Sequence, residues 1–203
     1  MKLFLSSIRL PNQEEHTKLF DNRSTISVAV VPNAWDTYPE DRQKVELANT
    51  LAEFEKLGYK TTVIDLTTSN SNVKENLEPY DFIWIMGGNT FYLNYKIRMT
   101  GFDKTLRTAV ANGLVYGGTS AGAVVAGPTI HGAENVDDPS DAPKVIWDGL
   151  GLVDFGIVPH WGMEKYASNL EKMRDDMQPH VGQIIKLTND EAVLEVDGKR
   201  QVR

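Results

Sequence analysis

Residues 82–86, Phe-Ile-Trp-Ile-Met, form an unbroken apolar run between Asp81 and the pair Gly87-Gly88. A strand that is apolar at every position has no face to turn toward water, which is typical of a strand buried on both faces of a parallel sheet. The run therefore predicts a central strand whose sheet carries helices on both faces.

The rest of the chain alternates between strand-like and helix-like segments. Strands are expected at residues 3–5, 26–31, 61–66, 114–116, 156–158, 184–187 and 192–196. Helices are expected at residues 40–57, 90–99, 103–112 and 164–177, and a buried helix is expected to begin at 121. Residues 132–143 are expected to form a long loop, and the turn pair 197–198 leaves little room for a further strand. This alternation predicts an α/β fold of three layers, a largely parallel sheet with helices on both faces, in a single domain over residues 1–203.

Composition narrows the class of protein. The chain has 203 residues, 41% hydrophobic and 24% charged, which is typical of an ordinary folded domain. A net charge of −7 without a cluster of Lys and Arg disfavours a nucleic-acid or anionic-membrane partner. Because there is no cysteine, disulfides, thiolate metal ligands and cysteine nucleophiles are excluded. The first apolar run is too short for a secretory signal and no apolar stretch has the length of a membrane span, so we expect a cytoplasmic protein.

The sharpest chemical signal is Gly118-Thr119-Ser120-Ala121-Gly122, which matches the G-x-S-x-G pattern of a nucleophile elbow. A serine on a tight strand-to-helix turn has a strained backbone, and side chains two positions away on either side would collide. Apolar residues precede the motif and small apolar residues follow it, as a strand and a helix would require. The pattern favours Ser120 as a nucleophile over the alternative, a structural turn with an inert serine.

A serine hydroxyl needs a base and a site for the oxyanion. His160 follows a predicted strand, where a side chain is rigidly placed, so it is the expected base. The N–H groups of Ala121 and of Gly88, which follows the buried strand, are the expected oxyanion donors. The other histidines are in polar or loop surroundings: His16, His131 and His180.

A third member should be a carboxylate that orients the histidine. Glu134, which lies between Ser120 and His160 in the chain, is our candidate, and Asp190 and Glu191 stay open because they lie beyond the histidine. The sequence offers several further acidic residues around these positions: Asp137, Asp138, Asp141 and Glu164.

Three motifs together resemble the dipeptidase E and cyanophycinase family of serine peptidases. They are residues 87–91 (Gly-Gly-Asn-Thr-Phe), residues 118–123 (Gly-Thr-Ser-Ala-Gly-Ala) and residues 159–161 (Pro-His-Trp). The motifs come in the family's order at comparable spacing, and the likeness covers roughly residues 25–200. The resemblance implies a class I glutamine-amidotransferase-like α/β fold.

The resemblance also assigns roles. It places Ser120 on the family's nucleophile, His160 on its histidine, and Gly88 and Ala121 on its oxyanion donors. Dipeptidase E has an aspartate in the loop after the nucleophile helix, where this chain has Asn135 with Glu134 beside it. Cyanophycinase-like members have a glutamate in that loop, which favours Glu134.

The substrate is less constrained. Dipeptidase E removes an N-terminal aspartate, and reading that side chain requires a cation or fixed donors near the nucleophile. The basic stretch that dipeptidase E has after its histidine is missing here, where Lys165 and Arg174 are the cations before Lys186. We therefore expect hydrolysis of small peptides, with the preference for aspartate left open.

Other functions remain as alternatives. An esterase, an amidase or a cyanophycinase-like hydrolase could use the same residues, and a degenerate site would leave a binding module. The chain has no phosphate-binding loop, dinucleotide fingerprint or zinc-type histidine pair, so no cofactor or metal is expected. The expected partner is a small peptide substrate, with no nucleic acid and no membrane, and a homodimer is left open.

Overall fold

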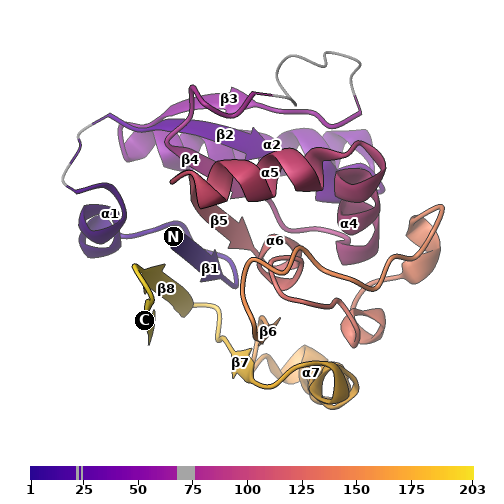
Figure 1. Cartoon of the computed structure of the whole chain (residues 1–203). Helices are drawn as coiled ribbons and strands as arrows, with labels where there is room; N and C mark the ends of the chain where they lie inside the picture. Colours follow the sequence, from indigo (N-terminus) through magenta and orange to yellow (C-terminus); the bar gives the residue numbers. More distant parts are fainter. Residues whose placement is uncertain (22, 24, 68–75) are drawn as a thin grey trace.

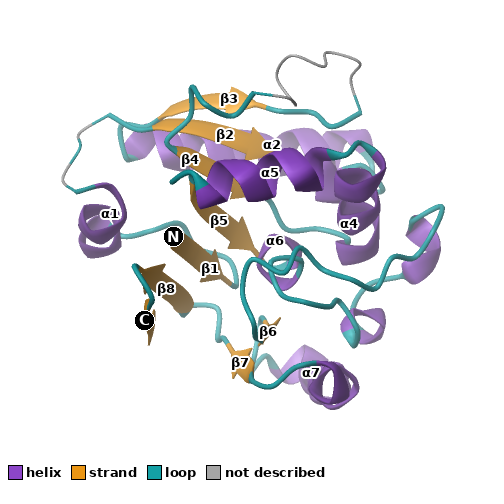
Figure 2. Ribbon diagram, viewed as in Figure 1, coloured by secondary structure: helices purple, strands orange, loops and turns teal. Residues whose placement is uncertain are grey.

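The predicted central strand lies in the middle of a mixed sheet. In the computed structural model, which describes residues 1–21, 23, 25–67 and 76–203, β4 (Phe82–Ile85) pairs in parallel with β2 (Ser27–Val31) and with β5 (Val115–Thr119). β3 (Lys60–Val63) extends the sheet beyond β2, and β1 (Lys2–Ser6) extends it beyond β5, both in parallel. This arrangement brings the carboxyl ends of β4, β5 and β1 to one edge of the sheet (Figure 2).

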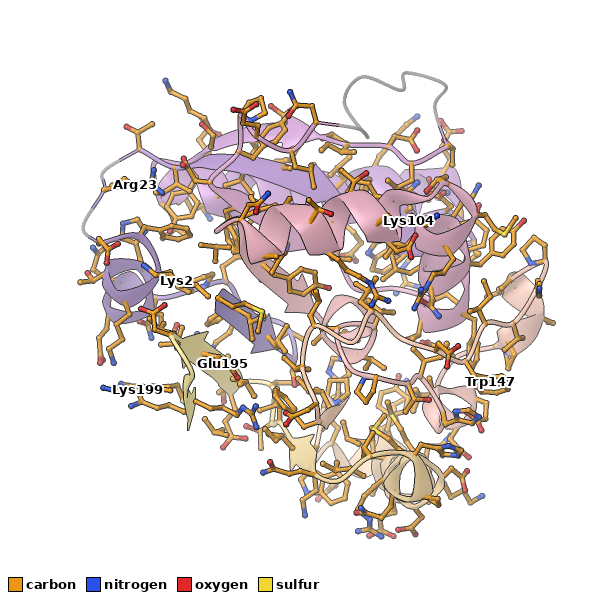
Figure 3. All side chains as sticks on the ribbon, in the orientation of Figure 1. Lys2, Arg23, Lys104, Trp147, Glu195 and Lys199 are labelled. Atoms are coloured by element: carbon orange, nitrogen blue, oxygen red, sulfur yellow. The ribbon has the colours of Figure 1, made fainter. Side chains whose placement is uncertain are left out.

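Two antiparallel strands complete the sheet. β8 (Ala192–Val196) pairs with β1, and β9 (Lys199–Val202) pairs with β8, which gives the order β3-β2-β4-β5-β1-β8-β9 within the described residues. The expectation of little room for a strand after residues 197–198 is therefore wrong. Asp197 and Gly198 both have positive φ, the backbone of a tight hairpin turn, so β9 begins at once. Glu195 and Lys199 lie at this end of the sheet (Figure 3).

Helices cover both faces of the sheet, which confirms the predicted three-layer α/β fold (Figure 1). On one face lie α1 (Gln13–Phe20) and α2 (Glu40–Lys56), and on the other lie α4 (Thr90–Met99) and α5 (Phe102–Ala111). Side chains of β4 alternate between the two cores: Phe82 and Trp84 pack toward α1 and α2, while Ile83 and Ile85 pack toward α4 and α5. All four are buried, as the unbroken apolar run predicted.

Most helix boundaries agree with the sequence expectations to within a residue, but α1 was missed. The signal for it was in the sequence: Asn12 accepts a hydrogen bond from the N–H of Glu15, and the Glu15 side chain accepts one from the N–H of Asn12. This reciprocal capping box is a recognised helix start. None of the helices in the described part of the chain is long and apolar enough to span a membrane.

The segment after β5 folds against the carboxyl edge of the sheet. It contains the short helix α6 (Ala121–Val124), the 3₁₀ turns η2 (Ala133–Asn135) and η3 (Pro139–Asp141), and a small parallel pair of strands, β6 (Gly156–Val158) and β7 (Ile184–Lys186). The expected helix at 164–177 is the 3₁₀ turn η4 (Glu164–Tyr166) followed by α7 (Ala167–Met177), and η5 (Gln178–His180) follows it. Trp147 lies on the loop between η3 and β6 (Figure 3).

Candidate active site

Ser120 lies on a sharp turn between β5 and α6, at the carboxyl edge of the sheet. Its backbone has φ 47° and ψ −113°, a conformation that a residue with a side chain rarely adopts. The turn is held from two sides: the N–H of Ser120 donates to the carbonyl of Ser6 at 3.0 Å, and the hydroxyl of buried Tyr116 donates to the carbonyl of Gly122 at 2.6 Å. Hydrogen bonds from β1 and from the serine's own strand β5 thus fix a strained serine in place.

The flanking glycines are required by close backbone contacts. A Cβ added at Gly118 would lie 2.4 Å from the carbonyl oxygen of Gly122, and one added at Gly122 would lie 2.2 Å from the carbonyl oxygen of Ile85. Both distances are far below van der Waals contact, so neither position accepts a side chain. The collision predicted from the G-x-S-x-G spacing is therefore present on both sides of Ser120.

His160 contacts Ser120 directly. It follows β6, and its Nε2 lies 2.9 Å from Ser120 Oγ. Its backbone also has positive φ, and its N–H donates to the hydroxyl oxygen of Ser7 at 3.0 Å. Ser7 is fully buried and donates in turn to the carbonyl of Leu187 at 2.9 Å. One serine hydroxyl at the end of β1 thereby ties down the backbone that carries the imidazole.

Asn189 occupies the position where a carboxylate was expected. Its side-chain oxygen Oδ1 lies 2.9 Å from Nδ1 of His160. Because a carbonyl oxygen only accepts, this contact keeps a proton on Nδ1 and leaves the Nε2 lone pair facing the serine hydroxyl. An amide oxygen gives the same tautomer as a carboxylate would, but without a full negative charge.

The three carboxylates considered from the sequence lie elsewhere. Glu134 is exposed and accepts a hydrogen bond from the N–H of Gly132 at 2.7 Å. Glu191 accepts one from the N–H of Thr188 at 2.8 Å, and the side chain of Asp190 is exposed. The expectation that Glu134 completes the site is corrected by the geometry: Asn189, between β7 and β8, takes the place at Nδ1. Asn135, the position implied by dipeptidase E, donates to Asp176 and to the carbonyl of Gly132.

The two predicted oxyanion donors are available. Within the described residues, the N–H groups of Gly88 and Ala121 donate to no acceptor. The loop of Gly88 is joined to the serine turn because the N–H of Gly87 donates to Thr119 Oγ1 at 3.0 Å. Gly88 has φ 136°, and a Cβ there would lie 2.3 Å from the carbonyl oxygen of Ala34, so this loop requires glycine.

Ser120 and His160 open into a cavity of about 520 Å³ at the carboxyl edge of the sheet. Apolar, polar and charged side chains all belong to its lining. Besides His160, three acidic residues and one arginine belong to its lining: Glu46, Glu53, Asp137 and Arg42. Neither Lys165 nor Arg174, the cations considered from the sequence, contributes to this lining; they contact the rings of Tyr166 and Trp161 respectively.

Asp137 enters this cavity from the loop that was expected at 132–143. Its Oδ2 accepts from the N–H of Thr90 at 2.9 Å and from the Thr90 hydroxyl at 2.5 Å. Asn89, the residue before Thr90, donates to the Asp141 carboxylate at 2.9 Å. The loop is thus fastened to the first turn of α4. Burial raises the pKa of Asp137, an effect that the Thr90 hydrogen bonds and the charge of His160 oppose.

In the sequence, Asp137 is one acidic residue among several. Three residues of the site were not predicted: Asn189, Arg42 and Ser7. Nothing in the local pattern marks these three residues, because each acts through contacts with distant segments. Within the described residues, no cluster of His, Asp and Glu side chains could hold a metal ion.

Comparison with known proteins identifies the family of the chain. The model of Peptidase family S51 matches residues 4–202. The uncharacterized peptidase Lmo0363 of Listeria monocytogenes is 30% identical over 202 residues, which cover 98% of this chain and 96% of the relative. A peptidase E of Nostoc sp. is 35% identical over 136 residues, which cover 67% of this chain and 50% of the relative.

Solved structures share the fold. A crystal structure from Listeria monocytogenes EGD-e, provisionally described as a peptidase E protein, superposes with a TM-score of 0.83 at 27% identity and covers 100% of this chain and 97% of that one. A peptidase from an acI-B1 Actinobacterium superposes with a TM-score of 0.77 at 19% identity, a likeness of fold. The family match and the peptidase relatives confirm the resemblance drawn from the three motifs: the chain belongs to peptidase family S51 and is a serine-type peptidase, a hydrolase.

Proposed function

We propose that the protein hydrolyses short peptides with Ser120 as nucleophile, His160 as general base and Asn189 as the residue that orients His160. The observation that carries the proposal is a continuous hydrogen-bond chain from Ser120 Oγ to His160 Nε2 and from His160 Nδ1 to Asn189 Oδ1, with 2.9 Å at each contact. In a nucleophile elbow of this kind, the strained turn lifts the hydroxyl off the edge of the sheet and toward the substrate.

The first half of the reaction is acylation. Ser120 Oγ attacks the peptide carbonyl carbon while its proton passes to His160 Nε2. The carbonyl oxygen becomes an oxyanion that the N–H groups of Gly88 and Ala121 stabilise, each contributing about 3–4 kcal/mol to the transition state. The carbon–nitrogen bond then breaks, and His160 returns the proton to the leaving amine. The product of this half is an acyl-serine.

The second half is deacylation. Water attacks the acyl carbon and gives a proton to His160 Nε2, and the same two N–H groups receive the oxyanion. Collapse releases the carboxylic acid, and the proton returns to Ser120 Oγ. Throughout, Asn189 Oδ1 holds the Nδ1 proton, so that Nε2 is the nitrogen that exchanges protons with Ser120.

The test compares wild type, Ser120→Ala and the control Ser168→Ala, which alters an exposed serine on α7. A fluorophosphonate should label wild type and Ser168→Ala but not Ser120→Ala. Turnover of a dipeptide panel should fall at least about 10³-fold in Ser120→Ala. Undiminished turnover in a folded Ser120→Ala protein contradicts the proposal. Esters are included in the panel because the same steps hydrolyse them.

If the enzyme prefers an N-terminal aspartate, Arg42 is the residue that would bind the aspartate side chain. Among the described residues of the cavity lining, Arg42 is the one Lys or Arg, and its guanidinium lies 5.0 Å from the ring centroid of Trp35 and 5.2 Å from that of Tyr38. If aspartate is selected, Arg42→Gln should raise KM for Asp-X dipeptides about 10-fold or more and leave Ala-X dipeptides unchanged. Equal effects on both panels would exclude this role.

A further inference from the structure

The two oxyanion donors of the proposed reaction belong to two separate loops. Gly88 follows β4, and Ala121 follows β5 at the start of α6. The parallel ladder between β4 and β5 ends before either donor is reached. Within the described residues, no backbone hydrogen bond joins residues 86–88 to residues 119–122. The spacing of the two donors must therefore be fixed by something other than backbone pairing.

The side chain of Thr119 connects the two loops. Its hydroxyl oxygen Oγ1 accepts a hydrogen bond from the N–H of Gly87 at 3.0 Å. Thr119 directly precedes the nucleophile Ser120, and Gly87 directly precedes the donor Gly88. The loops also pack closely, because a Cβ added at Gly87 would lie 3.0 Å from the Cβ of Ser120. One half-buried threonine hydroxyl thus takes over where the backbone pairing of β4 and β5 stops.

The direction of the Gly88 N–H depends on this connection. On either side of the glycine pair, the N–H groups of Met86 and Asn89 donate to carbonyl oxygens in residues 31–34, at 3.0 Å and 2.8 Å. The glycines between these two anchors rotate with little steric restriction. Without the bond to Thr119, both peptide units between the anchors would be free to rotate. With it, one of them is fixed, and the direction in which the other points its N–H is restricted.

We infer that Thr119 is a positioning residue that sets the spacing of the oxyanion donors Gly88 and Ala121 by holding Gly87. Two donors stabilise an oxyanion only when both lie at hydrogen-bond distance from the place where the charge develops. A displaced Gly88 N–H would stabilise the transition state less, but it would not weaken the binding of the uncleaved peptide, whose carbonyl carries little charge. The inference rests on the proposed function and adds to it a residue at a position that the motif G-x-S-x-G leaves unspecified.

The test replaces Thr119 in two ways. Thr119→Val keeps the shape of the side chain and removes the acceptor, while Thr119→Ser keeps the hydroxyl and removes only a methyl group. On the dipeptide that wild type cleaves fastest, Thr119→Val should lower kcat about 30-fold with KM unchanged, because one of two donors is displaced. Thr119→Ser should keep kcat within about 3-fold of wild type. An unchanged kcat in Thr119→Val, or the same loss in both variants, overturns the inference.

Thr129→Val is the matched control for a loss of stability. Thr129 is buried, and its hydroxyl oxygen likewise accepts from a backbone N–H, that of His131 at 3.2 Å, but it lies outside the lining of the Ser120 cavity. Both valine variants leave a backbone N–H without its acceptor, so both should unfold at lower urea concentration than wild type. Only Thr119→Val should lose kcat. An equal loss of kcat in Thr129→Val would trace the effect to stability and overturn the inference.

A transition-state analogue tests the geometry of the donors directly. A peptide aldehyde adds to Ser120 Oγ as a hemiacetal whose oxygen lies at the oxyanion site, so its Ki should rise about 30-fold in Thr119→Val, in parallel with the loss of kcat. Calorimetry should find equal binding of the uncleaved dipeptide to Ser120→Ala and to the double variant that also carries Thr119→Val. A Ki that Thr119→Val leaves unchanged, or dipeptide binding weakened as much as aldehyde binding, overturns the inference.

Labelling of Ser120 by a fluorophosphonate separates failure of this inference from failure of the proposed function. If wild type is neither labelled nor active, the proposed function is wrong and the inference falls with it. If wild type is labelled and active, and Thr119→Val has the same kcat and the same Ki, the inference alone is wrong and the proposed function stands.

Discussion

The side-chain oxygen of Asn189 lies 2.9 Å from Nδ1 of His160, at the place where serine hydrolases commonly carry a carboxylate. The amide fixes the tautomer that a general base needs. It stabilises the imidazolium of the transition state less than a carboxylate would, because it carries a dipole and no net charge.

This difference predicts opposite effects for two substitutions. Asn189→Asp should retain the orientation and place a full negative charge beside the imidazolium that forms in the transition state, so kcat/KM should rise. Asn189→Leu removes the acceptor and should lower kcat/KM about 100-fold at all pH values. The measurement is the pH profile of the three proteins on one substrate. Identical profiles for wild type and Asn189→Leu would exclude an orienting role.

Ser7 should act as a positioning residue for His160. Ser7→Ala leaves the His160 N–H without its acceptor, and the Leu187 carbonyl keeps only the N–H of Trp161 as a donor. The expected cost is about 1–3 kcal/mol in the free energy of unfolding. The substitution should also lower kcat about 10-fold to 100-fold with KM unchanged, since the imidazole shifts but the cavity does not.

The control for Ser7→Ala is Ser6→Ala, which changes the neighbouring buried serine. The Ser6 hydroxyl donates to the carbonyl of Arg9 at 2.7 Å and does not touch His160. We expect Ser6→Ala to destabilise the fold without lowering kcat. Equal losses of kcat in the two variants would mean that Ser7 acts through stability alone.

Gly122→Ala should be strongly destabilising. The new Cβ would lie 2.2 Å from the carbonyl oxygen of Ile85, so β4 and the serine turn would have to separate. We expect a loss of at least about 3 kcal/mol in the free energy of unfolding by urea denaturation. Gly182→Ala is the control, because a Cβ there meets nothing within 4 Å. It should change stability by less than about 1 kcal/mol.

The stacked imidazoles of His131 and His180 should make the fold sensitive to acid. Their ring centroids lie 3.8 Å apart, and His131 stacks on Trp147 on its other side. Burial, and then the charge of His180, lowers the pKa of His131 from 6.5, while Glu134 and Asp148 oppose the shift. The unfolded chain therefore takes up the proton first as pH falls through about 6.5. The stabilisation is present above that pH and is lost below it.

Urea denaturation at pH 8, 6.5 and 5 measures this effect. The free energy of unfolding of wild type should decrease over this series, and the decrease should be smaller in His180→Gln, which removes the like charge. His16→Gln, which alters a histidine paired with Tyr59 and the Arg23 carbonyl instead, should leave the decrease unchanged. The same slope in His180→Gln and wild type would contradict this role for the stack.

Several features followed from the sequence because their causes are local. The apolar run at 82–86 has no polar side chain to present to water on either face, so it had to lie inside a sheet covered on both faces. β4 is buried as expected. The strand-turn-helix around Ser120 followed from the spacing of Gly118 and Gly122 about the serine. The collision at Gly118 is with Gly122, within the motif, whereas the collision at Gly122 is with Ile85 of β4. The capping box of α1 was equally local and could have been found from Asn12 and Glu15.

The rest was decided by contacts between segments that no local pattern relates. Glu134 was chosen for its charge and its place in the chain, yet its carboxylate turns back to Gly132, while Asn189 reaches His160 from the connection between β7 and β8. Asp137 became distinctive only when folding buried it beside Thr90 in the cavity of Ser120. The sequence by itself determined the fold and the serine turn. A carboxylate and an amide have similar effects on the local backbone, so no local pattern shows which of them faces the histidine. The packing of distant loops decided that.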